Sequence, residues 1–412
     1  MTAGAVAAFL RYPAAHMKLL GLLVLLVAVA CATAPPPPPK VVDEQTRNAI
    51  KGLTEAVAKQ PANMAWIYVL ATYHAKAGDT AEVVRWLTRL DELGWEHGVS
   101  PIEFAGLDSR EFRGIRSKLE AREPRASKAR VAFTMSGQRD LVPEGIAWDP
   151  VDDVFYVSGI YRRKVLRVTR DGKASDFVAE GQDGMLGGLG VKVDAKRRLL
   201  WVVSSTTKEM RGYVEGQEAS MLAAYDLRDG RLVKKINAGP AKLNDLALLD
   251  DGSLFATDMG RHKVVRLPAG GEAFEDWAEG FSWPNGIAVS DDQRHLYVAD
   301  FRGVTRFDVT DKTKESVGKG MLSGIDGLSF HRGTLIGIQN AVGKPRVVRI
   351  HLADGRVEVL ETKNAAFELP TTGAVAGSDY WFIANPGLRS FEGSTIWPME
   401  KLEEPVMLRI AL

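Results

Sequence analysis

The sequence has almost no cysteine: Cys31 is the single one among 412 residues. One thiol excludes an intrachain disulfide. A chain of this length can bury a core large enough to do without a disulfide, even outside the cytoplasm. The position of Cys31 near the N-terminus therefore needs a different explanation.

An excess of charge of either sign is also missing. The chain has 53 Lys and Arg against 52 Asp and Glu, which leaves a net charge of +1. A balanced chain has no global field that would favour nucleic acid or an anionic surface as a partner. The other fractions, 45% hydrophobic and 25% charged, are ordinary for a globular protein. The length suffices for two or three domains.

A membrane-spanning run is lacking as well. The N-terminal apolar stretch Leu19–Ala30 has twelve residues, whereas a spanning helix needs about 20. It follows Met17-Lys18 and ends in small residues, the layout of a secretory signal. Ala28-Val29-Ala30-Cys31 resembles a bacterial lipobox. We therefore expect residues 1–31 to be a signal peptide whose cleavage exposes Cys31 for lipidation.

This interpretation predicts a lipid-anchored protein of the bacterial cell envelope, on its periplasmic or outer-membrane face. The alternative is a plain secretory signal with a chance cysteine. Residues 32–42 form a Pro-rich linker with five consecutive prolines at 35–39. Such a run adopts a stiff polyproline II spacer. It would hold the folded part away from the membrane.

Residues 43–125 show apolar side chains at helical spacing. Two apolar stripes are separated by a break at Ala77-Gly78-Asp79, which predicts two helices joined by a turn. The stretch from Trp66 to Leu93 resembles a tetratricopeptide unit. Only one or two such repeats fit, and arrays usually need about three to be stable alone. We expect this region to dock on its neighbour, either as a structural cap or as an arm that binds a protein partner.

After residue 130 the pattern changes to short apolar runs separated by turn signals, as in all-β folds. One phrase recurs six times: a glycine or its substitute, alternating apolar residues, a polar turn and a second apolar strand. The third positions of the phrases are residues 145, 188, 245, 286, 327 and 373. A period of about 40–50 residues with four short strands is typical of propeller blades.

The predicted fold class is therefore mainly β: a six-bladed β-propeller over residues 129–412, preceded by a small α-helical, tetratricopeptide-like region. The sixth unit lacks an obvious fourth strand after Met407–Ile410. We expect Ala129–Met135, just before the first blade, to supply that strand and close the ring. Closure removes the exposed strand edges that would otherwise invite aggregation.

Equivalent positions of six blades face one another round the axis. The second positions of the phrases are Glu144, Gly187, Asn244, Asn285, Asp326 and Thr372. Two carboxylates that converge in a confined mouth are costly without a counter-ion. Calcium takes six to eight oxygen ligands of this kind. Without cysteine or histidine at these positions, zinc is disfavoured. The alternative is that Asn and Asp only form turns at strand ends.

Several short motifs resemble the regucalcin/gluconolactonase family of calcium-dependent propellers, also known for senescence-marker protein and related to strictosidine synthase and paraoxonase. The motifs are Glu144-Gly145, Asn244-Asp245 with Asp251-Gly252, Pro284-Asn285-Gly286 with Tyr297-Val298-Ala299-Asp300, and Asp326-Gly327. The resemblance covers about residues 140–390.

This resemblance implies a metal held by Glu144, Asn285 and Asp326. It places Asn244 beside the metal, in contact with substrate or water, and makes Asp326 the general base as well. The implied function is a calcium-dependent hydrolase of lactones or related esters at the channel mouth. A metal polarises the carbonyl and lowers the pKa of bound water, and a carboxylate moves the proton.

The sequence departs from the family at two points. Lys242 stands where animal members commonly carry an arginine that contacts substrate, so a preference for sugar lactones is not implied. No histidine occupies the ring, because His262 and His331 fall past the turns, which gives a paraoxonase-type histidine base no support. Asp258 and Asp300 end second strands and could line the same mouth or serve turns.

The alternative function is a non-catalytic, metal-binding propeller lipoprotein that binds a protein or a small molecule. Propellers host many roles, so the fold alone does not decide. The expected partners are a small lactone or ester in the channel and the membrane through Cys31. A protein partner is expected at the helical region if that region is a binding arm rather than a structural cap.

Overall fold

The computed structural model describes residues 42–319 and 321–412. The predicted signal peptide, Cys31 and all but the last residue of the Pro-rich linker lie outside the described residues. Within the part described, no helix combines the length and the apolar character needed to cross a membrane.

The N-terminal region is helical. Its helices are α1 (Glu44–Lys59), α2 (Met64–Ala77), α3 (Thr80–Glu92) and α4 (Arg110–Arg122). Each begins at a polar cap whose side chain accepts a backbone N–H of the first turn. Gly78 ends α2 in the left-handed conformation, with φ of 77°. The predicted break at Ala77-Gly78-Asp79 is therefore the α2–α3 turn.

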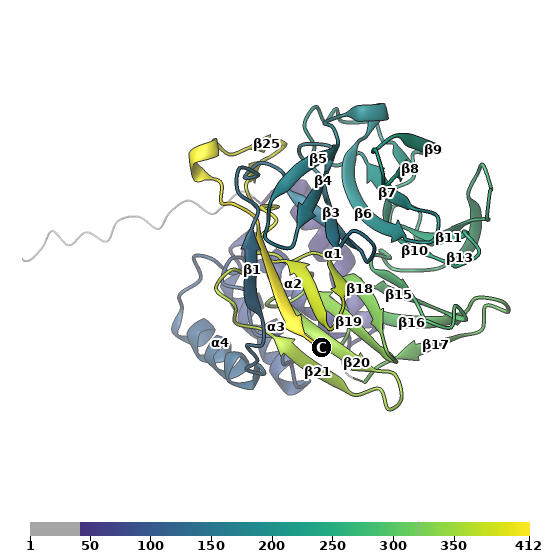
Figure 1. Cartoon of the computed structure of the whole chain (residues 1–412). Helices are drawn as coiled ribbons and strands as arrows, with labels where there is room; N and C mark the ends of the chain where they lie inside the picture. The colour runs from purple at the N-terminus through teal and green to yellow at the C-terminus, as the bar shows by residue number, and fades with distance from the viewer. Residues whose placement is uncertain (1–41, 320) are drawn as a thin grey trace, which may run out of the picture. The chain divides into compact units, whose positions relative to one another are not determined.

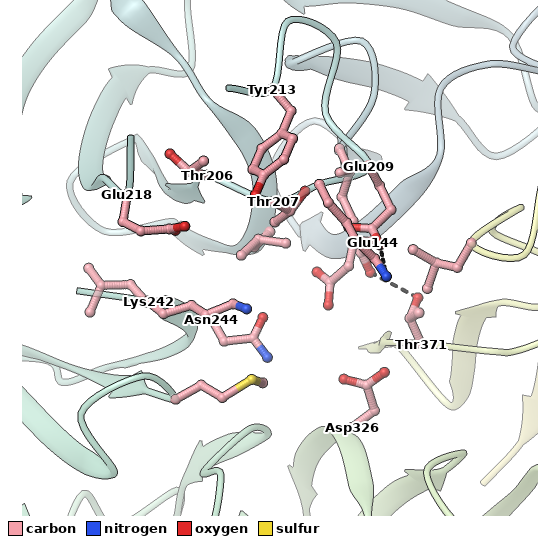
Figure 2. A pocket seen from close by; sticks show the side chains of 16 residues that line it. Glu144, Thr206, Thr207, Glu209, Tyr213, Glu218, Lys242, Asn244, Asp326 and Thr371 are labelled. Atoms are coloured by element: carbon pink, nitrogen blue, oxygen red, sulfur yellow. Dashed lines mark hydrogen bonds and ion pairs between the residues drawn. The ribbon is translucent and has the colours of Figure 1, made fainter. Parts of the chain in front are cut away.

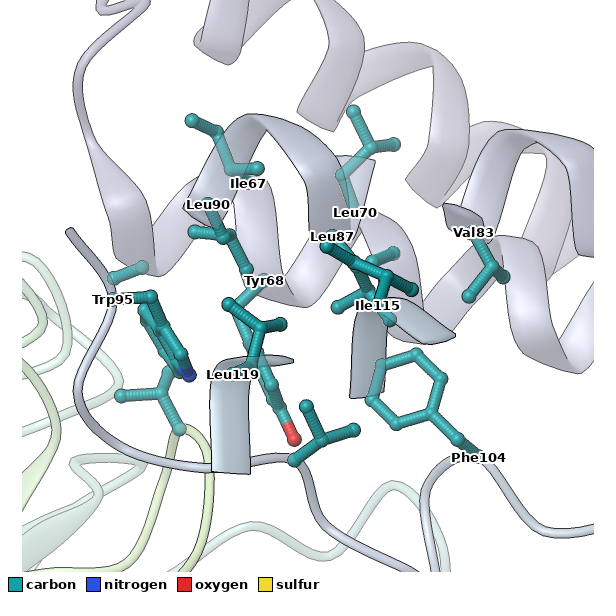
Figure 3. Close-up of a cluster of buried hydrophobic side chains, with 14 of the residues drawn as sticks. Ile67, Tyr68, Leu70, Val83, Leu87, Leu90, Trp95, Phe104, Ile115 and Leu119 are labelled. Atoms are coloured by element: carbon teal, nitrogen blue, oxygen red, sulfur yellow. The ribbon is translucent and has the colours of Figure 1, made fainter. Parts of the chain in front are cut away.

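The apolar faces of these helices meet in one cluster, in which Tyr68, Leu87, Trp95 and Phe104 are buried (Figure 3). Tyr68 and Trp95 stack with ring centroids 4.9 Å apart. The same cluster includes Val342, from a loop of the β region. The helical core thus continues into the propeller, and residues 42–412 form one compact unit. The likeness to a tetratricopeptide unit remains a prediction.

Polar contacts also join the two regions. Lys344 pairs with Glu123 at 3.0 Å, and its backbone N–H donates to the carbonyl of His97 at 2.8 Å. The hydroxyl of Thr362 donates to the carbonyl of Pro124 at 3.0 Å. The docking expected from the small number of helices is therefore present in the structure.

Six four-stranded antiparallel sheets follow one another in the β region (Figure 1). The first three are β2 (Pro143–Asp149), β3 (Val154–Gly159), β4 (Lys164–Thr169) and β5 (Ala174–Val178); β6 (Gly187–Asp194), β7 (Leu199–Ser205), β8 (Ser220–Asp226) and β9 (Leu232–Gly239); and β10 (Leu243–Leu248), β11 (Leu254–Asp258), β12 (Lys263–Leu267) and β13 (Glu275–Glu279).

The other three sheets are β14 (Ile287–Val289), β15 (His295–Asp300), β16 (Gly303–Asp308) and β17 (Lys314–Val317); β18 (Ile325–His331), β19 (Thr334–Gln339), β20 (Arg346–His351) and β21 (Val357–Glu361); and β22 (Gly373–Ala376), β23 (Asp379–Ile383), β26 (Val406–Ala411) and β1 (Arg130–Thr134). The fold is therefore the six-bladed propeller that the repeat predicted.

The first and last strands close the ring. β1 pairs antiparallel with β26, with Arg130 opposite Arg409 and Thr134 opposite Val406. This confirms the prediction that the segment before the first blade completes the sixth. Trp381 of β23 packs between Phe155 of blade 1 and Phe133 of β1, with centroid distances of 5.0 and 6.2 Å. The aromatic cluster therefore stabilises the junction between blade 6, which β1 completes, and blade 1.

We expect Trp381→Ala to lower the free energy of unfolding by about 3–5 kcal/mol, the usual cost of truncating a large buried side chain. Trp381 is 4% exposed, whereas Trp397 is 41% exposed. Trp397→Ala is the matched control and should cost less than about 0.5 kcal/mol. Equilibrium urea unfolding measures both. Equal losses in the two variants would contradict a structural role for this junction.

Candidate metal and substrate site

The innermost strands are the first strands of the six blades, and they contact one another in order round the ring. At their starts the pairing with the second strand is irregular. In β2, β10 and β18 the register shifts between Pro143 and Ile146, Leu243 and Leu246, and Ile325 and Leu328. Glu144, Asn244 and Asp326 lie inside these irregularities. A bulge redirects side chains, and here it marks the same position in three blades.

A second backbone feature is shared by three of the predicted site positions. The residue two before Glu144, Asn285 and Asp326 has a positive φ: 51° at Val142, 51° at Trp283 and 69° at Gly324. Non-glycine residues adopt this conformation only at a cost of about 1–3 kcal/mol. The positive φ thus occurs at the same position of blades 1, 4 and 5, which are the blades whose residues the family resemblance makes metal ligands.

Glu144, Asn244 and Asp326 line one cavity of about 380 Å³ (Figure 2). Asn285 joins them because its side-chain oxygen accepts a hydrogen bond from the Asn244 amide. Four of the six positions expected to converge therefore do so. The sixth, Thr372, uses its hydroxyl to bond the backbone carbonyl of Glu144 and ties blade 6 to blade 1.

One oxygen of the Glu144 carboxylate is buried without a hydrogen-bond partner among the described residues. Glu144 is 6% exposed, and this oxygen is its Oε2. Burial raises the pKa of Glu144 well above its usual range, and the carboxylates of Asp326 and Asp245 raise it further. Lys192 works in the opposite direction, but its ammonium contacts Asp245 at 3.3 Å. The site therefore holds more negative charge than its own residues neutralise.

Asp326 is held from one side. Asn340, just past the end of β19, donates to its Oδ2 and also to the carbonyl of Pro370 at 2.9 Å. Burial raises the pKa of Asp326 to about 6, although hydrogen bonds from Asn340 and Asn285 oppose the shift. A carboxyl with this pKa exchanges its proton near neutral pH.

This donor set fits a hard divalent cation. Two carboxylates and two amides present oxygen ligands at one mouth, and the unpartnered Oε2 of Glu144 is an acceptor that a cation would satisfy. Across the described residues, no group of three or more His, Cys, Asp or Glu side chains is spaced for a metal. Glu144 and Asp326 alone would therefore not suffice, and a metal here would also need amide oxygen such as that of Asn285.

The remaining candidates fall outside the cavity. Asp258 accepts from the backbone N–H groups of Lys242 and Arg261, each at 3.1 Å. Asp300 accepts in the same way from Ser282 at 2.9 Å and Arg302 at 2.8 Å. Both aspartates therefore order turns, which was one of the two interpretations that the sequence allowed.

Gly187, the equivalent position of the second blade, brings no side chain to the site. A Cβ at Gly187 would lie 3.1 Å from the carbonyl of Ser205 and 3.4 Å from the hydroxyl of Thr207. Thr207 thus occupies the space beside this glycine. His262 is exposed and His331 is half-buried at the end of β18. Neither histidine lines the cavity.

One wall of the cavity was missed by the sequence analysis. Residues 206–219 connect β7 to β8 and bring Thr206, Glu209, Tyr213 and Glu218 to the cavity (Figure 2). The 57-residue step between the second and third phrases, against 41 to 46 elsewhere, was the available signal. It marked an insertion without showing that the insertion folds over the mouth.

A second insertion meets the first. Residues 384–405 lie between β23 and β26 and include the hairpin β24 (Phe391–Glu392) and β25 (Thr395–Ile396). Leu388 from this segment lines the cavity. Phe391 contacts Tyr161 of blade 1 at 6.1 Å between ring centroids, and both pack in one cluster with Tyr213. Blades 2 and 6 thus jointly cover part of the mouth.

Comparison with known proteins finds one matching protein family. The family model described as "SMP-30/Gluconolactonase/LRE-like region" matches residues 142–329, from the first blade into the fifth. No curated protein matches this chain.

Solved structures show weaker likenesses. A gluconolactonase from Xanthomonas campestris is 19% identical, with 65% of this chain and 86% of that chain covered and a TM-score of 0.48. A luciferin-regenerating enzyme is 15% identical, with 66% and 92% covered and a TM-score of 0.48. Virginiamycin B lyase from Staphylococcus aureus is 14% identical, with 62% and 81% covered and a TM-score of 0.45. These values carry no argument about activity.

The family match lies wholly within the propeller, and the six closed blades and the motifs at the mouth agree with it. Over residues 142–329 the propeller of this chain is therefore similar to the SMP-30/gluconolactonase/LRE-like family.

Proposed function

We propose that this protein is a divalent-metal-dependent hydrolase of lactones or related esters, with calcium as the metal. The observation that carries the proposal is the buried, unpartnered carboxylate oxygen of Glu144 in the same cavity as Asp326. Carboxylates in such a place are costly unless a cation is bound. Glu144, Asn285 and Asp326 would hold the cation, with Asn244 beside it.

Bound there, calcium would supply positive charge that polarises an ester carbonyl and makes water easier to deprotonate. Asp326 is the residue suited to take the proton: its pKa of about 6 in the metal-free protein leaves it ionised at neutral pH, and a bound cation would favour the ionised form further. Asn340 orients it by holding Oδ2. The product of a lactone would be the open hydroxy acid.

The cavity walls define what can enter. Ile160, Leu189 and Leu243 form buried apolar walls. Lys242, Glu209 and Glu218 bring charge to the same cavity. Apolar walls reduce the water around the carboxylates and strengthen their interaction with a cation. The substrate is therefore expected to combine an ester group with an apolar portion.

The first prediction concerns metal and turnover together. After chelation, the protein should take up one calcium ion and gain thermal stability, as any ligand specific to the native state produces. Glu144→Ala and Asp326→Ala should lose uptake and turnover of a lactone and ester panel while keeping the native circular dichroism. Asp308→Asn is the control that should keep uptake, because Asp308 lies outside the cavity and its carboxylate accepts from the backbone N–H of Thr310 at 2.8 Å.

Two outcomes would contradict parts of the proposal. If no ion binds, the converging residues have only a structural role, as turns at the ends of the repeated strands. If calcium binds but no lactone or ester is turned over, the protein is better described as a non-catalytic metal-binding propeller, and partner capture through the helical region becomes the next experiment.

The second prediction concerns pH. In the metal-free protein the pKa of Asp326 is raised by folding from 3.8 to about 6. The unfolded chain therefore loses this proton first, and the carboxyl costs stability progressively from about pH 4 to pH 6 and fully above that range. Asp326→Asn should raise the stability of the chelated protein at pH 7.5, by roughly 1–3 kcal/mol, and should flatten its decline between pH 4 and 6.

The order should reverse with calcium present, because the wild type alone gains from the metal. Urea unfolding at pH 4, 6 and 7.5, with chelator and with calcium, measures this. The prediction would be contradicted if the chelated Asp326→Asn variant were less stable than wild type at pH 7.5, because ionised Asp326 would then not destabilise the metal-free protein.

The third prediction concerns location. We propose a lipid anchor at Cys31, which would place the propeller in the bacterial cell envelope. Cys31→Ala should remove the lipid and shift the full chain from the membrane fraction to the soluble fraction after alkaline washing. Detection of an unlipidated mature wild-type chain by mass spectrometry would favour the plain secretory signal instead.

A further inference from the structure

The helical region contacts the loop that precedes Asn285. Trp66 of α2 lies 4.7 Å from Phe301 and 6.4 Å from Trp283, measured between ring centroids. Trp283 and Phe301 meet edge to face at 6.1 Å and 87°. Trp283 stands two residues before Asn285. Three aromatic rings therefore connect α2 to a predicted metal ligand.

Trp283 differs from its equivalents in the other two ligand blades. All three positions have positive φ. Gly324 has no Cβ and adopts this conformation freely. Val142 is 1% exposed and is held inside the propeller core. Trp283 is bulky, strained and 52% exposed. Its conformation therefore depends on contacts with other elements rather than on burial in a blade. Its ring lies near Trp66, Phe301 and His262, and its N–H donates to Nδ1 of His262 at 3.5 Å.

Backbone hydrogen bonds hold the residues on either side of Trp283 against the end of β15. The N–H of Ser282 donates to Asp300 at 2.9 Å, and its carbonyl accepts from Phe301 at 2.8 Å. The N–H of Asn285 donates to the carbonyl of Ala299 at 2.9 Å. Ser282 and Asn285 are thus both tied to the end of β15, whereas Trp283 between them is held by contacts with side chains.

We propose that Trp66 is a positioning residue for the metal site: it holds Trp283 in its strained conformation and thereby fixes the direction of Asn285. This inference rests on the proposed metal function. It gives the helical region a role in the site, because α2 completes the support of one ligand from outside the propeller.

The test compares two tryptophan truncations within the helical region, using the full chain in detergent. Trp66→Ala should weaken calcium binding about tenfold, as loss of support for a ligand typically does. Trp86→Ala is the matched control. Its indole lies on α3 and stacks with Arg85 at 4.6 Å, within the helical region. Trp86→Ala should leave calcium affinity unchanged in calorimetry, and Trp66→Phe should restore most of the lost affinity.

A second readout does not need the metal. Hydrogen exchange of the chelated protein should be faster in residues 281–287 of Trp66→Ala and unchanged in the equivalent residues 140–146. Trp283→Gly supplies the coupling test, because glycine adopts positive φ without strain. On that background, Trp66→Ala should no longer change calcium affinity, which a double-mutant cycle measures.

The positioning role is overturned if Trp66→Ala and Trp86→Ala behave alike in both readouts, or if Trp66→Ala has its full effect on the Trp283→Gly background. If exchange in residues 281–287 responds as expected but the wild type binds no calcium, Trp66 does position Asn285 and the metal proposal is what fails. Unchanged exchange and affinity in a calcium-binding Trp66→Ala variant would leave the metal proposal standing and remove the positioning role.

Discussion

Closure of the ring is the constraint on which the rest of the structure depends. β1 belongs to the start of the β region, yet it completes the last blade by pairing with β26. Once this pair forms, the six inner strands are held round one axis and their first residues must share one mouth. Side chains as distant in sequence as Glu144 and Asp326 are then neighbours. Every later feature of the site follows from that proximity.

Proximity of this kind has an energetic consequence. Glu144 is buried and Asp326 is half-buried, and each has a raised pKa. The native state of the chain alone is therefore less stable at neutral pH than a similar fold with uncharged residues at these positions. The strained backbone at Val142 and Trp283 adds to this cost. Strain and unpaired charge in the same place are what a preorganised cation site requires, since the ligands cannot relax away from one another.

The two insertions and the helical region contact different parts of the site at the channel mouth. Residues 206–219 and 384–405 come from blades and meet through Tyr213, Phe391 and Tyr161, so they shape what reaches the cavity. The helices contact the loop that precedes the proposed ligand Asn285, through Trp66 and Trp283. The helical core also runs into the propeller at Val342. The two regions therefore stabilise each other, which agrees with the compactness of residues 42–412 as one unit.

Much of the architecture was determined by the sequence itself. The recurring phrase predicted six blades because each blade repeats the same short apolar runs separated by polar turns. Ala129–Met135 was identified as the closing strand because the last unit lacked one. The convergence of Glu144, Asn244, Asn285 and Asp326 was also predictable, since shared register in a propeller means shared position. Local patterns suffice where the repeat itself carries the geometry.

Only the tertiary structure decided the rest. The roles of Asp258 and Asp300 depend on which backbone N–H groups lie within reach, and the sequence allowed both a site role and a turn role. The cover over the mouth depends on where two irregular insertions pack, which no repeat describes. The contact between Trp66 and Trp283 joins residues 217 positions apart with no pattern in common. Such contacts arise from the packing of whole elements, and the sequence of either element alone does not contain them.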